Sequence, residues 1–283
     1  MNLGLRAAAV TVAPAGRPYH DDPQVAEFNQ DLAAAFGLGV EEELLRAGRN
    51  LTHADLVDLL VAELPAGLPA PDLVVLARVL PDLNQYKTVA SYLNLRTGGR
   101  AHSFAIAGQG LGAPFLALRV ALAYARSGRS RSSMIAVLEQ TTLPFRDGVV
   151  HGGVPLVDSG VLLCLDAGAG PWRPTSVVEF GTGEDPNTGL KTLADTADAP
   201  LAVMGPWLAG SDQGDPEVHR VAPGGYGTSV WLALAREAER WAADHDALLL
   251  CDTDPRTGVT HVARFDRCAP QPEMPAVVDT LEA

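Results

Sequence analysis

The sequence has little positive charge, no long apolar run and no leader-like segment. Its 283 residues include 21 Lys and Arg against 34 Asp and Glu, which gives a net charge of −13. Nucleic acids and anionic membranes need a basic footprint, so neither is expected as the main partner. No run of about 18 apolar residues suggests a membrane span, and the N-terminus lacks the apolar core of a signal peptide. We therefore expect a soluble cytoplasmic protein.

Cysteines are also scarce, and their spacing argues against metal or disulfide scaffolds. The three cysteines form no CxxC or CxH pattern, which disfavours a disulfide framework or structural zinc. Cys164 and Cys251 lie in apolar runs and are expected in the core. The seven histidines do not pair at metal-ligand spacing. We therefore predict no metal site and no cofactor.

Short apolar strands alternate with helices along the chain, which is typical of an α/β layered fold. A buried strand is expected over 71–81, between prolines. A helix is expected over 51–64, with Thr52 as its N-cap. A second helix is expected over 84–99, and a third over 113–128. Because the third helix is apolar nearly all round, we expect it to be central and buried.

The second half of the chain contains fewer clear elements than the first. The segment 166–176 is a plausible boundary, which gives two halves, 1–166 and 172–283. The tract 182–222 is expected to be mostly loop. The tail from Pro270 is expected to be a loose extension. No short-period repeat is evident.

A glycine-rich turn at 108–112 joins a strand to the central helix. Gly108, Gly110 and Ala113 fit G-x-G-x-x-A, and Glu139 ends the following strand, where a ribose-binding acid would lie. This pattern suggests a dinucleotide-binding oxidoreductase. However, a long α/β stretch precedes the turn, and Pro114 removes one amide that would cradle a pyrophosphate. The oxidoreductase is therefore kept as an alternative.

Several segments, taken in order, resemble the type III ketosynthases of the thiolase superfamily (β-ketoacyl-acyl-carrier-protein synthases). The stretch from 103 to 128 is SFAIAGQGLGAPFLALRVALAYARSG, which resembles the family's F-x-x-x-Q-G-C-x-x-G-L-x-A-L-x-x-A. The segments SSMIAVLEQT, VPLVDSGVLLCLD and GTSVWLALAREAERW resemble its V-L-V-V-x-x-E strand, its F-G-D-G-A-x-A-x-x-L strand and its closing N-T-S-x-x-S-x-x-x-A-L helix. The resemblance implies a thiolase-like αβαβα fold with two pseudo-repeated halves, the second shortened.

The same resemblance exposes departures at the catalytic positions. The family's acyl-accepting Cys position is occupied by Leu111, or by Gly110 when counted from Phe104. The family's Asn position falls near Gly224, and His219 lies too close to it in sequence to match the family's His. None of the Cys-His-Asn triad carries over.

Four residues remain as pocket candidates. Gln109 and Tyr226 are the most plausible polar ones, and Leu111 would act as a hydrophobic plug. His151 is a candidate base, although an exposed or hydrogen-bonded loop histidine explains it better. The segment 251–258, CDTDPRTG, resembles an Asp-rich metal loop, but a hairpin turn explains it better.

These departures imply a degenerate ketosynthase-III-like subunit. It would pair with an active ketosynthase-III-like chain and shape or stabilise that chain's acyl pocket, in polyketide, fatty-acyl or quinolone-type secondary metabolism. It is similar to the non-catalytic partner subunit of the alkylquinolone-forming condensing enzyme. Acyl carrier protein or an acyl-CoA thioester would be further partners. Arg126, Arg129 and Arg131 could form the local basic patch that a carrier needs, although a solvated helix end explains them better.

Two other hypotheses stay open beside this one and the oxidoreductase. One is an active acyltransferase or condensing enzyme, with relocated catalytic residues acting on acyl thioesters through proximity and carbonyl polarisation. The other is a homodimer that only binds. Whether the chain is itself an enzyme is not decided by the sequence.

Overall fold

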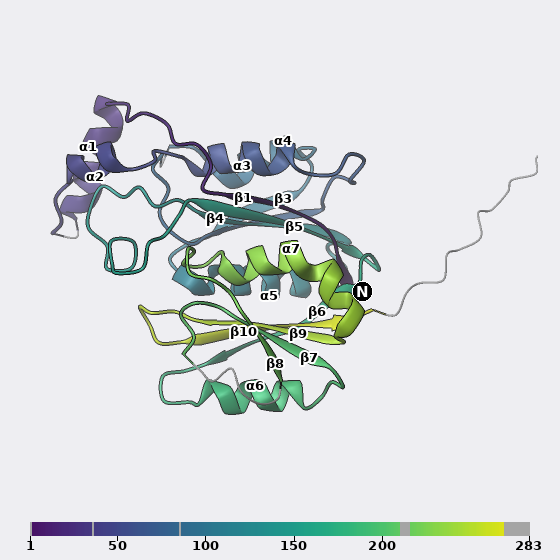
Figure 1. The fold of residues 1–283 in the computed structure, drawn as a ribbon. Helices are drawn as coiled ribbons and strands as arrows, with labels where there is room; N and C mark the ends of the chain where they lie inside the picture. The colour runs from purple at the N-terminus through teal and green to yellow at the C-terminus, as the bar shows by residue number, and fades with distance from the viewer. Residues whose placement is uncertain (1, 36, 85, 210–215, 269–283) are drawn as a thin grey trace, which may run out of the picture.

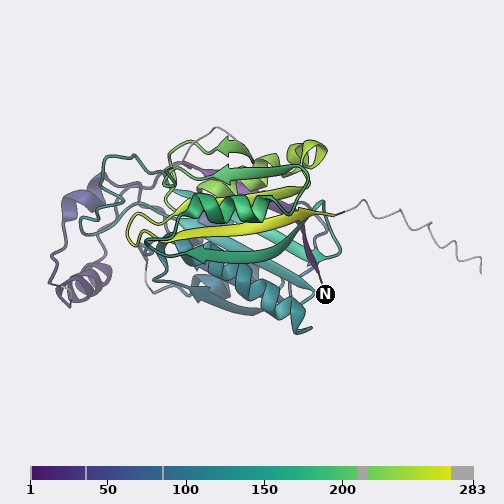
Figure 2. The same cartoon turned by 90° about the horizontal axis from the view of Figure 1, so that it is seen from below.

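The computed structural model describes residues 2–35, 37–84, 86–209 and 216–268, which stack in five layers (Figure 1). An outer layer of α3 and α4 covers the first sheet, α5 and α7 lie between the two sheets, and α6 covers the second sheet. Figure 2 shows α6 across the outer face of the second sheet. The helices of these layers are α3 (His53–Ala62), α4 (Val89–Arg96), α5 (Ala113–Arg126), α6 (Pro186–Ala194) and α7 (Ser229–Asp244).

The two five-stranded sheets have the same topology. The first has the order β1-β5-β4-β2-β3 and the second the order β6-β10-β9-β7-β8, so the strands of each half occupy corresponding places. In each sheet three neighbouring strands are parallel and the other pairings are antiparallel. This correspondence confirms the predicted αβαβα fold with two related halves.

Each strand of the second sheet is one residue shorter than its counterpart in the first sheet. The strands of the first sheet are β1 (Leu3–Val12), β2 (Leu73–Arg78), β3 (His102–Ile106), β4 (Ser132–Glu139) and β5 (Ser159–Ala167). Those of the second are β6 (Trp172–Phe180), β7 (Pro200–Met204), β8 (Glu217–Arg220), β9 (Ala247–Thr253) and β10 (Thr260–Arg267).

Helix α5 is central because apolar residues surround it on both sides. Phe115, Leu118 and Ala121 are fully buried and belong to one core cluster with residues of both sheets. The Phe115 ring meets Trp231 of α7 edge to face, with 5.0 Å between ring centroids. Burying a side chain of this size contributes about 2–3 kcal/mol. The prediction of a buried central helix is confirmed.

Other local predictions from the sequence are met in part. Thr52 is the N-cap of α3, and it forms a reciprocal capping box with Asp55. The helix expected over 84–99 is confined to α4, because the Asn84 side chain accepts the Tyr86 N–H and closes a turn instead. The boundary segment is mostly strand, since β5 runs to Ala167 and β6 begins at Trp172.

The loop-rich tract 182–222 also contains regular elements that the sequence did not reveal. It contains α6, β7 and β8. The Asp185 side chain caps α6 through the amides of Asn187 and Thr188. The two strands are only five and four residues long, and Gly205-Pro206 follows the first, which hides them from a pattern search. The expected loose tail from Pro270 lies outside the described residues.

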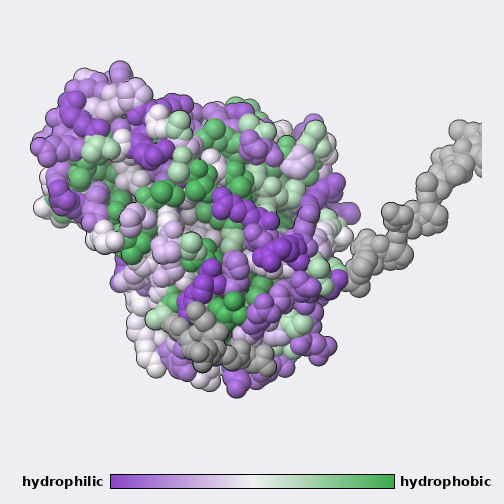
Figure 3. Space-filling model, viewed as in Figure 1, coloured by the Kyte–Doolittle hydropathy of each residue, from purple (hydrophilic) through white to green (hydrophobic). Residues whose placement is uncertain are grey.

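A projection formed by α1 (Pro23–Ala34) and α2 (Glu42–Ala47) extends from one corner of the layers (Figure 1). In the space-filling view most of this corner is hydrophilic, whereas hydrophobic residues reach the surface near the middle of the molecule (Figure 3). No helix in the described part of the chain is long and apolar enough to span a bilayer.

Replacing Phe115 with alanine should lower the free energy of unfolding by about 3–5 kcal/mol, because it leaves a cavity between the two sheets. Urea denaturation followed by circular dichroism measures this change. Leu95→Ala is the matched control, since Leu95 lies on α4 with 70% of its surface exposed, and its effect should stay within about 0.5 kcal/mol. Equal losses in the two variants would contradict the central position of α5.

Candidate functional site

The turn before α5 depends on a glycine that leaves room for another residue's hydroxyl. Gly110 begins the single 3₁₀ turn Gly110–Gly112 and has a φ of 49°. A Cβ at this position would overlap the Tyr226 hydroxyl and lie 2.7 Å from Oδ2 of Asp254. Both the backbone angle and the close approach therefore require glycine. A nucleophilic side chain could not occupy this position.

Tyr226 fills the space beside the first turn of α5. Its side chain is fully buried, and its hydroxyl donates to Oδ1 of Asp254 over 2.9 Å. Burial, and next the negative charge of Asp254, raise the pKa of Tyr226, while a hydrogen bond from the Leu111 backbone N–H opposes the shift. The hydroxyl thus stays protonated and engages a backbone amide at the start of α5, next to the positions where the resemblance puts an acyl-accepting thiol.

A cavity of about 550 Å³ opens on the other side of the turn. It lies between the end of β2, the turn, α5 and the tip of the β9–β10 hairpin. Its apolar wall includes Val79, Leu80, Leu116 and Val259. Its polar wall includes Arg78, Gln109, Arg119, Glu179, Arg256 and His261. Asp254 also lines it, so the Tyr226–Asp254 hydrogen bond forms part of its floor.

Of the four pocket candidates from the sequence, Gln109 lines this cavity directly and is exposed. Tyr226 lies behind the wall. Leu111 is 1% exposed and packs into the core cluster between the sheets. His151 lies in an exposed loop, where its Nδ1 accepts the Asp147 N–H over 2.9 Å, and it is not part of the cavity wall.

The remaining family positions do not gather around the cavity either. Gly224 has a φ of 146°, and its carbonyl accepts the Val157 N–H. His219 lies on β8, in the second sheet, with its ring 5.2 Å from that of Trp241. The turn is therefore surrounded by residues other than the ones that the resemblance points to.

Sequence reasoning missed His261, which is 9% exposed and lies against the start of α5. Its ring stacks on Phe115 with 5.4 Å between centroids, and its Cε1 would lie 2.7 Å from a Cβ at Gly112. Its Nδ1 is 3.7 Å from Oε1 of Glu179, which Arg119 also approaches at 3.3 Å. Burial lowers the pKa of His261, so its imidazole is neutral near pH 7.

The predicted hairpin at 251–258 is confirmed, and its tip belongs to the site. Gly258 N–H donates to the Asp254 carbonyl over 2.7 Å and closes the turn. The Arg256 guanidinium lies 5.0 Å above the Tyr226 ring and donates to both carboxylate oxygens of Asp147. Within the described residues, no group of three or more His, Cys, Asp or Glu side chains could hold a metal ion.

Glu139 has a structural role that conflicts with its proposed place at a ribose. It ends β4 fully buried, and its carboxylate accepts the N–H groups of Tyr226, Gly227 and Thr228 at 2.7, 2.8 and 3.2 Å. These amides precede α7, so the bond ties the first sheet to the start of that helix. Its acceptor atoms are occupied, and the dinucleotide alternative loses its acidic residue.

Burial also changes the acidity of this carboxyl. It raises the pKa of Glu139 to about 7, and the hydrogen bonds from the three amides oppose the shift. Burial likewise raises the pKa of Asp252, at the end of β9, to about 8. Both groups therefore change protonation near neutral pH.

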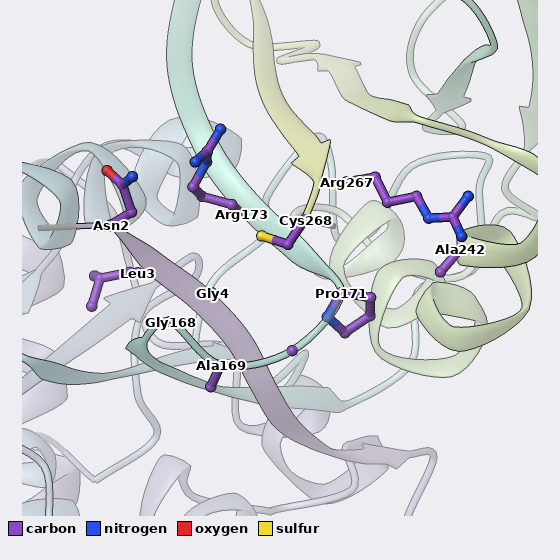
Figure 4. Close-up of a pocket in the computed structure, with 11 residues that line it drawn as sticks. Asn2, Leu3, Gly4, Gly168, Ala169, Pro171, Arg173, Ala242, Arg267 and Cys268 are labelled. Atoms are coloured by element: carbon purple, nitrogen blue, oxygen red, sulfur yellow. The ribbon is translucent and has the colours of Figure 1, made fainter. Parts of the chain in front are cut away.

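A second cavity, of about 640 Å³, lies at the opposite end of the strands, where β1 starts and β5 ends. Arg173, Arg267 and Cys268 line it (Figure 4). The two guanidinium groups lie apart, on either side of Cys268. These groups do not converge on one point, and none of the sequence-predicted candidates is near them.

Comparison with known proteins supports the fold alone. No family model matches the chain, and no curated protein sequence matches it. The solved structure of the acyltransferase ChlB3 matches over 95% of this chain and 99% of its own, with a TM-score of 0.64 and 15% identity. The 3-oxoacyl-[acyl-carrier-protein] synthase III of Aquifex aeolicus matches over 93% of this chain and 99% of its own, with a TM-score of 0.61 and 11% identity. The tetronic acid condensing enzyme AbyA1 matches over 93% of this chain and 99% of its own, with a TM-score of 0.60 and 18% identity.

The chain therefore has a thiolase-like fold. More narrowly, its architecture is that of the ketosynthase III-type condensing enzymes, at sequence identities that leave the chemistry of the site to be argued from its own residues.

The raised pKa values of Glu139 and Asp252 predict an unusual pH dependence. A carboxyl whose folded pKa lies above its unfolded value stabilises the fold at low pH, and this contribution is lost as pH rises through the folded pKa. The free energy of unfolding should therefore rise by about 2 kcal/mol when the pH falls from 8.5 to 6.5. Below that range His53 contributes in the opposite direction, because burial lowers its pKa to about 3 and the unfolded state then binds a proton that the folded state does not.

Urea denaturation at pH 8.5, 7.5 and 6.5 tests this dependence. Glu139→Gln should make the dependence shallower, since the amide does not titrate, and Asp252 should account for the part that remains. Glu239→Gln, on the exposed side of α7, is the matched control and should keep the wild-type slope. A wild-type stability that increases with pH over this range would contradict the assignment.

Removing the Tyr226 hydroxyl should destabilise the protein by about 1.5–3 kcal/mol, because Asp254 loses a hydrogen bond to a charged acceptor in a buried site. Tyr226→Phe can be compared with Tyr86→Phe in thermal unfolding. The Tyr86 side chain is 59% exposed and bonds a carbonyl at the surface, so its loss should be small. Similar small losses in both variants would show that the Tyr226 bond is unimportant.

Proposed function

We propose that this chain is a degenerate, non-catalytic ketosynthase III-like subunit that pairs with an active ketosynthase-like chain and supports that chain's acyl pocket. The observation that carries the proposal is the Tyr226 hydroxyl at the start of α5. With Asp254 and Gly110, it fills the place beside the turn where the related fold would hold an acyl-accepting side chain.

The positions of the cysteines support this proposal, because none lies at the turn. Cys164 and Cys251 are buried in the strands β5 and β9, and burial raises the pKa of Cys164 to about 12 and that of Cys251 still further. Cys268 lines the cavity at the opposite end. A thiol nucleophile needs its thiolate form and access to substrate, and none of the three meets both needs at this site.

Strand β3 offers a surface for pairing with another chain. It is an edge strand of the first sheet. The His102 N–H donates inward to Asp72, so the alternating N–H groups of Ser103 and Ala105 face the open edge. His102, Phe104 and Tyr124 form an aromatic cluster beside it, with centroids 5.6–6.3 Å apart. An open edge of this kind favours strand addition by a second chain.

The proposed setting follows from the same comparison. An active partner would take its acyl group from an acyl carrier protein or an acyl-CoA thioester, in polyketide, fatty-acyl or quinolone-type secondary metabolism. Arg129 and Arg131, just beyond the end of α5, are exposed and would give an acidic carrier a local basic contact in a protein of net charge −13.

Co-expression with a ketosynthase-like chain encoded in the same genome tests the proposal. Mass photometry should show a one-to-one complex or a multiple of it, and intact-protein mass after acyl-CoA addition should show acylation of the partner alone. Ala105→Pro should weaken the complex, because it removes an edge N–H, whereas Ala105→Ser should not. A stable homodimer that turns over acyl thioester without a partner would overturn the proposal.

A second candidate function is favoured by His261. Its neutral imidazole lies in the cavity beside Gly112, and Glu179 lies near its Nδ1. It could accept a proton from an acceptor that attacks an acyl thioester directly, so that the chain would be an acyltransferase or condensing enzyme without an acyl-enzyme. Homodimer turnover that is lost in His261→Gln and kept in His151→Gln would establish this function instead.

A further inference from the structure

Arg78 is a charged residue in an unusual position. It ends β2, a central strand whose preceding five residues are all buried, and its side chain lines the cavity beside the turn. Its guanidinium makes no direct hydrogen bond or ion pair within the described residues, although its charge acts on the nearby Asp82 carboxyl and His53 imidazole. Asp82 lines the smaller adjoining cavity that Arg78 also reaches, and its carboxylate accepts the His53 N–H. A half-buried guanidinium that lacks a directly hydrogen-bonded acceptor is stabilised by a ligand that supplies one.

The other charges of the cavity are compensated within the protein. Arg119 pairs with Glu179 at 3.3 Å, and Arg256 pairs with Asp147 at 2.8 Å. Asp254 accepts the Tyr226 hydroxyl and the Arg256 N–H. Arg78 is therefore the cationic group of this wall that remains available to a ligand.

A neutral donor and an apolar wall accompany Arg78. Gln109 follows β3, which pairs with β2 up to Ala77 and Ile106, so its exposed amide enters the same cavity. Val79, Leu80 and Leu116 provide apolar surface beside the guanidinium. The wall thus offers one positive charge, one amide and a hydrophobic face.

We propose that this cavity binds a small molecule with a single carboxylate, which the Arg78 guanidinium holds while the apolar body of the ligand lies against Val79, Leu80 and Leu116. A carboxylate matches the guanidinium fork in geometry and charge. A phosphate dianion would bring a second negative charge next to the carboxylates of Asp254 and Glu179, which line the same space. The inference rests on the proposed function in one respect: both assume that no acyl group is bound covalently in this cavity.

Calorimetric titration of the wild-type chain, or of its complex with the partner, tests the proposal. The probes are octanoate, its neutral analogue octanamide, and inorganic phosphate. Octanoate should bind at least tenfold more tightly than octanamide, because a charge-assisted bond to carboxylate is absent from the amide. Phosphate should bind more weakly than octanoate.

Variants locate the binding site. Arg78→Met should weaken octanoate binding at least tenfold, and Arg78→Lys should weaken it less, because it keeps the charge but loses the fork. Arg236→Met, at an exposed position of α7, is the matched control and should bind like the wild type. Circular dichroism of each variant checks that it is folded, and Arg78→Lys keeps the test decisive if Arg78→Met does not fold.

Several outcomes would overturn the inference: no octanoate binding by folded protein, equal binding of octanamide, tighter binding of phosphate, or an unchanged affinity in Arg78→Met. Mass photometry on the same preparations separates this result from the proposed function. If the chain binds octanoate but does not pair with the partner, the proposed function is overturned and the ligand site stands. If it pairs with the partner but does not bind octanoate, the ligand site is overturned and the proposed function stands. Acylation of this chain by octanoyl-CoA would overturn both.

Discussion

The carboxylate of Glu139 accepts the three amides that precede α7, and the arrangement of the site follows from these bonds. Through them the end of β4, in the first sheet, fixes where the second central helix begins. Tyr226 donates its backbone N–H to the same carboxylate, so its ring is placed beside the start of α5 and its hydroxyl reaches Asp254. One buried acid thus sets the relation between the two central helices and the residue that closes the turn.

Burying the Glu139 carboxylate is unfavourable, and the hydrogen bonds at the start of α7 offset this cost. A buried carboxylate is destabilising unless donors surround it. Here three amides and the Thr228 hydroxyl point at Glu139, and the positive end of the α7 dipole favours its charged form. The Tyr226 hydroxyl lies beside the turn before α5, where the Leu111 N–H approaches it. The amides before α7 are thus satisfied by a residue of this chain.

A feature of the fold or the site could be predicted from the sequence only where a pattern within a few neighbouring residues determines it. The burial of α5, the Thr52 cap and the hairpin at 251–258 follow from patterns within a few residues, and all three are found. The cavity wall is not local: Arg78, Gln109 and His261 come from β2, the turn and β10, and the stacking of the two sheets brings them together. Tyr226 was predicted as a pocket residue, but it lies behind the wall, in a place that depends on the absence of a side chain at Gly110, which no periodicity reveals. The elements within 182–222 were missed because short strands beside Gly205 leave too few residues to form a pattern.

The αβαβα layers are those of the related condensing enzymes, but the charged residues of the cavity beside α5 do not suit covalent acyl transfer. A covalent ketosynthase site needs a thiolate at the start of the central helix and neutral surroundings for an acyl chain. In this chain a hydroxyl and a carboxylate lie beside the turn before that helix, and β2 ends in a guanidinium that has no direct ion-pair partner among the described residues. An arginine at the end of β2 is a poor neighbour for an acyl chain, but it is a suitable neighbour for an acid. Under the proposed function, this charge pattern, together with the lack of a cysteine at the turn, distinguishes the cavity from a covalent site.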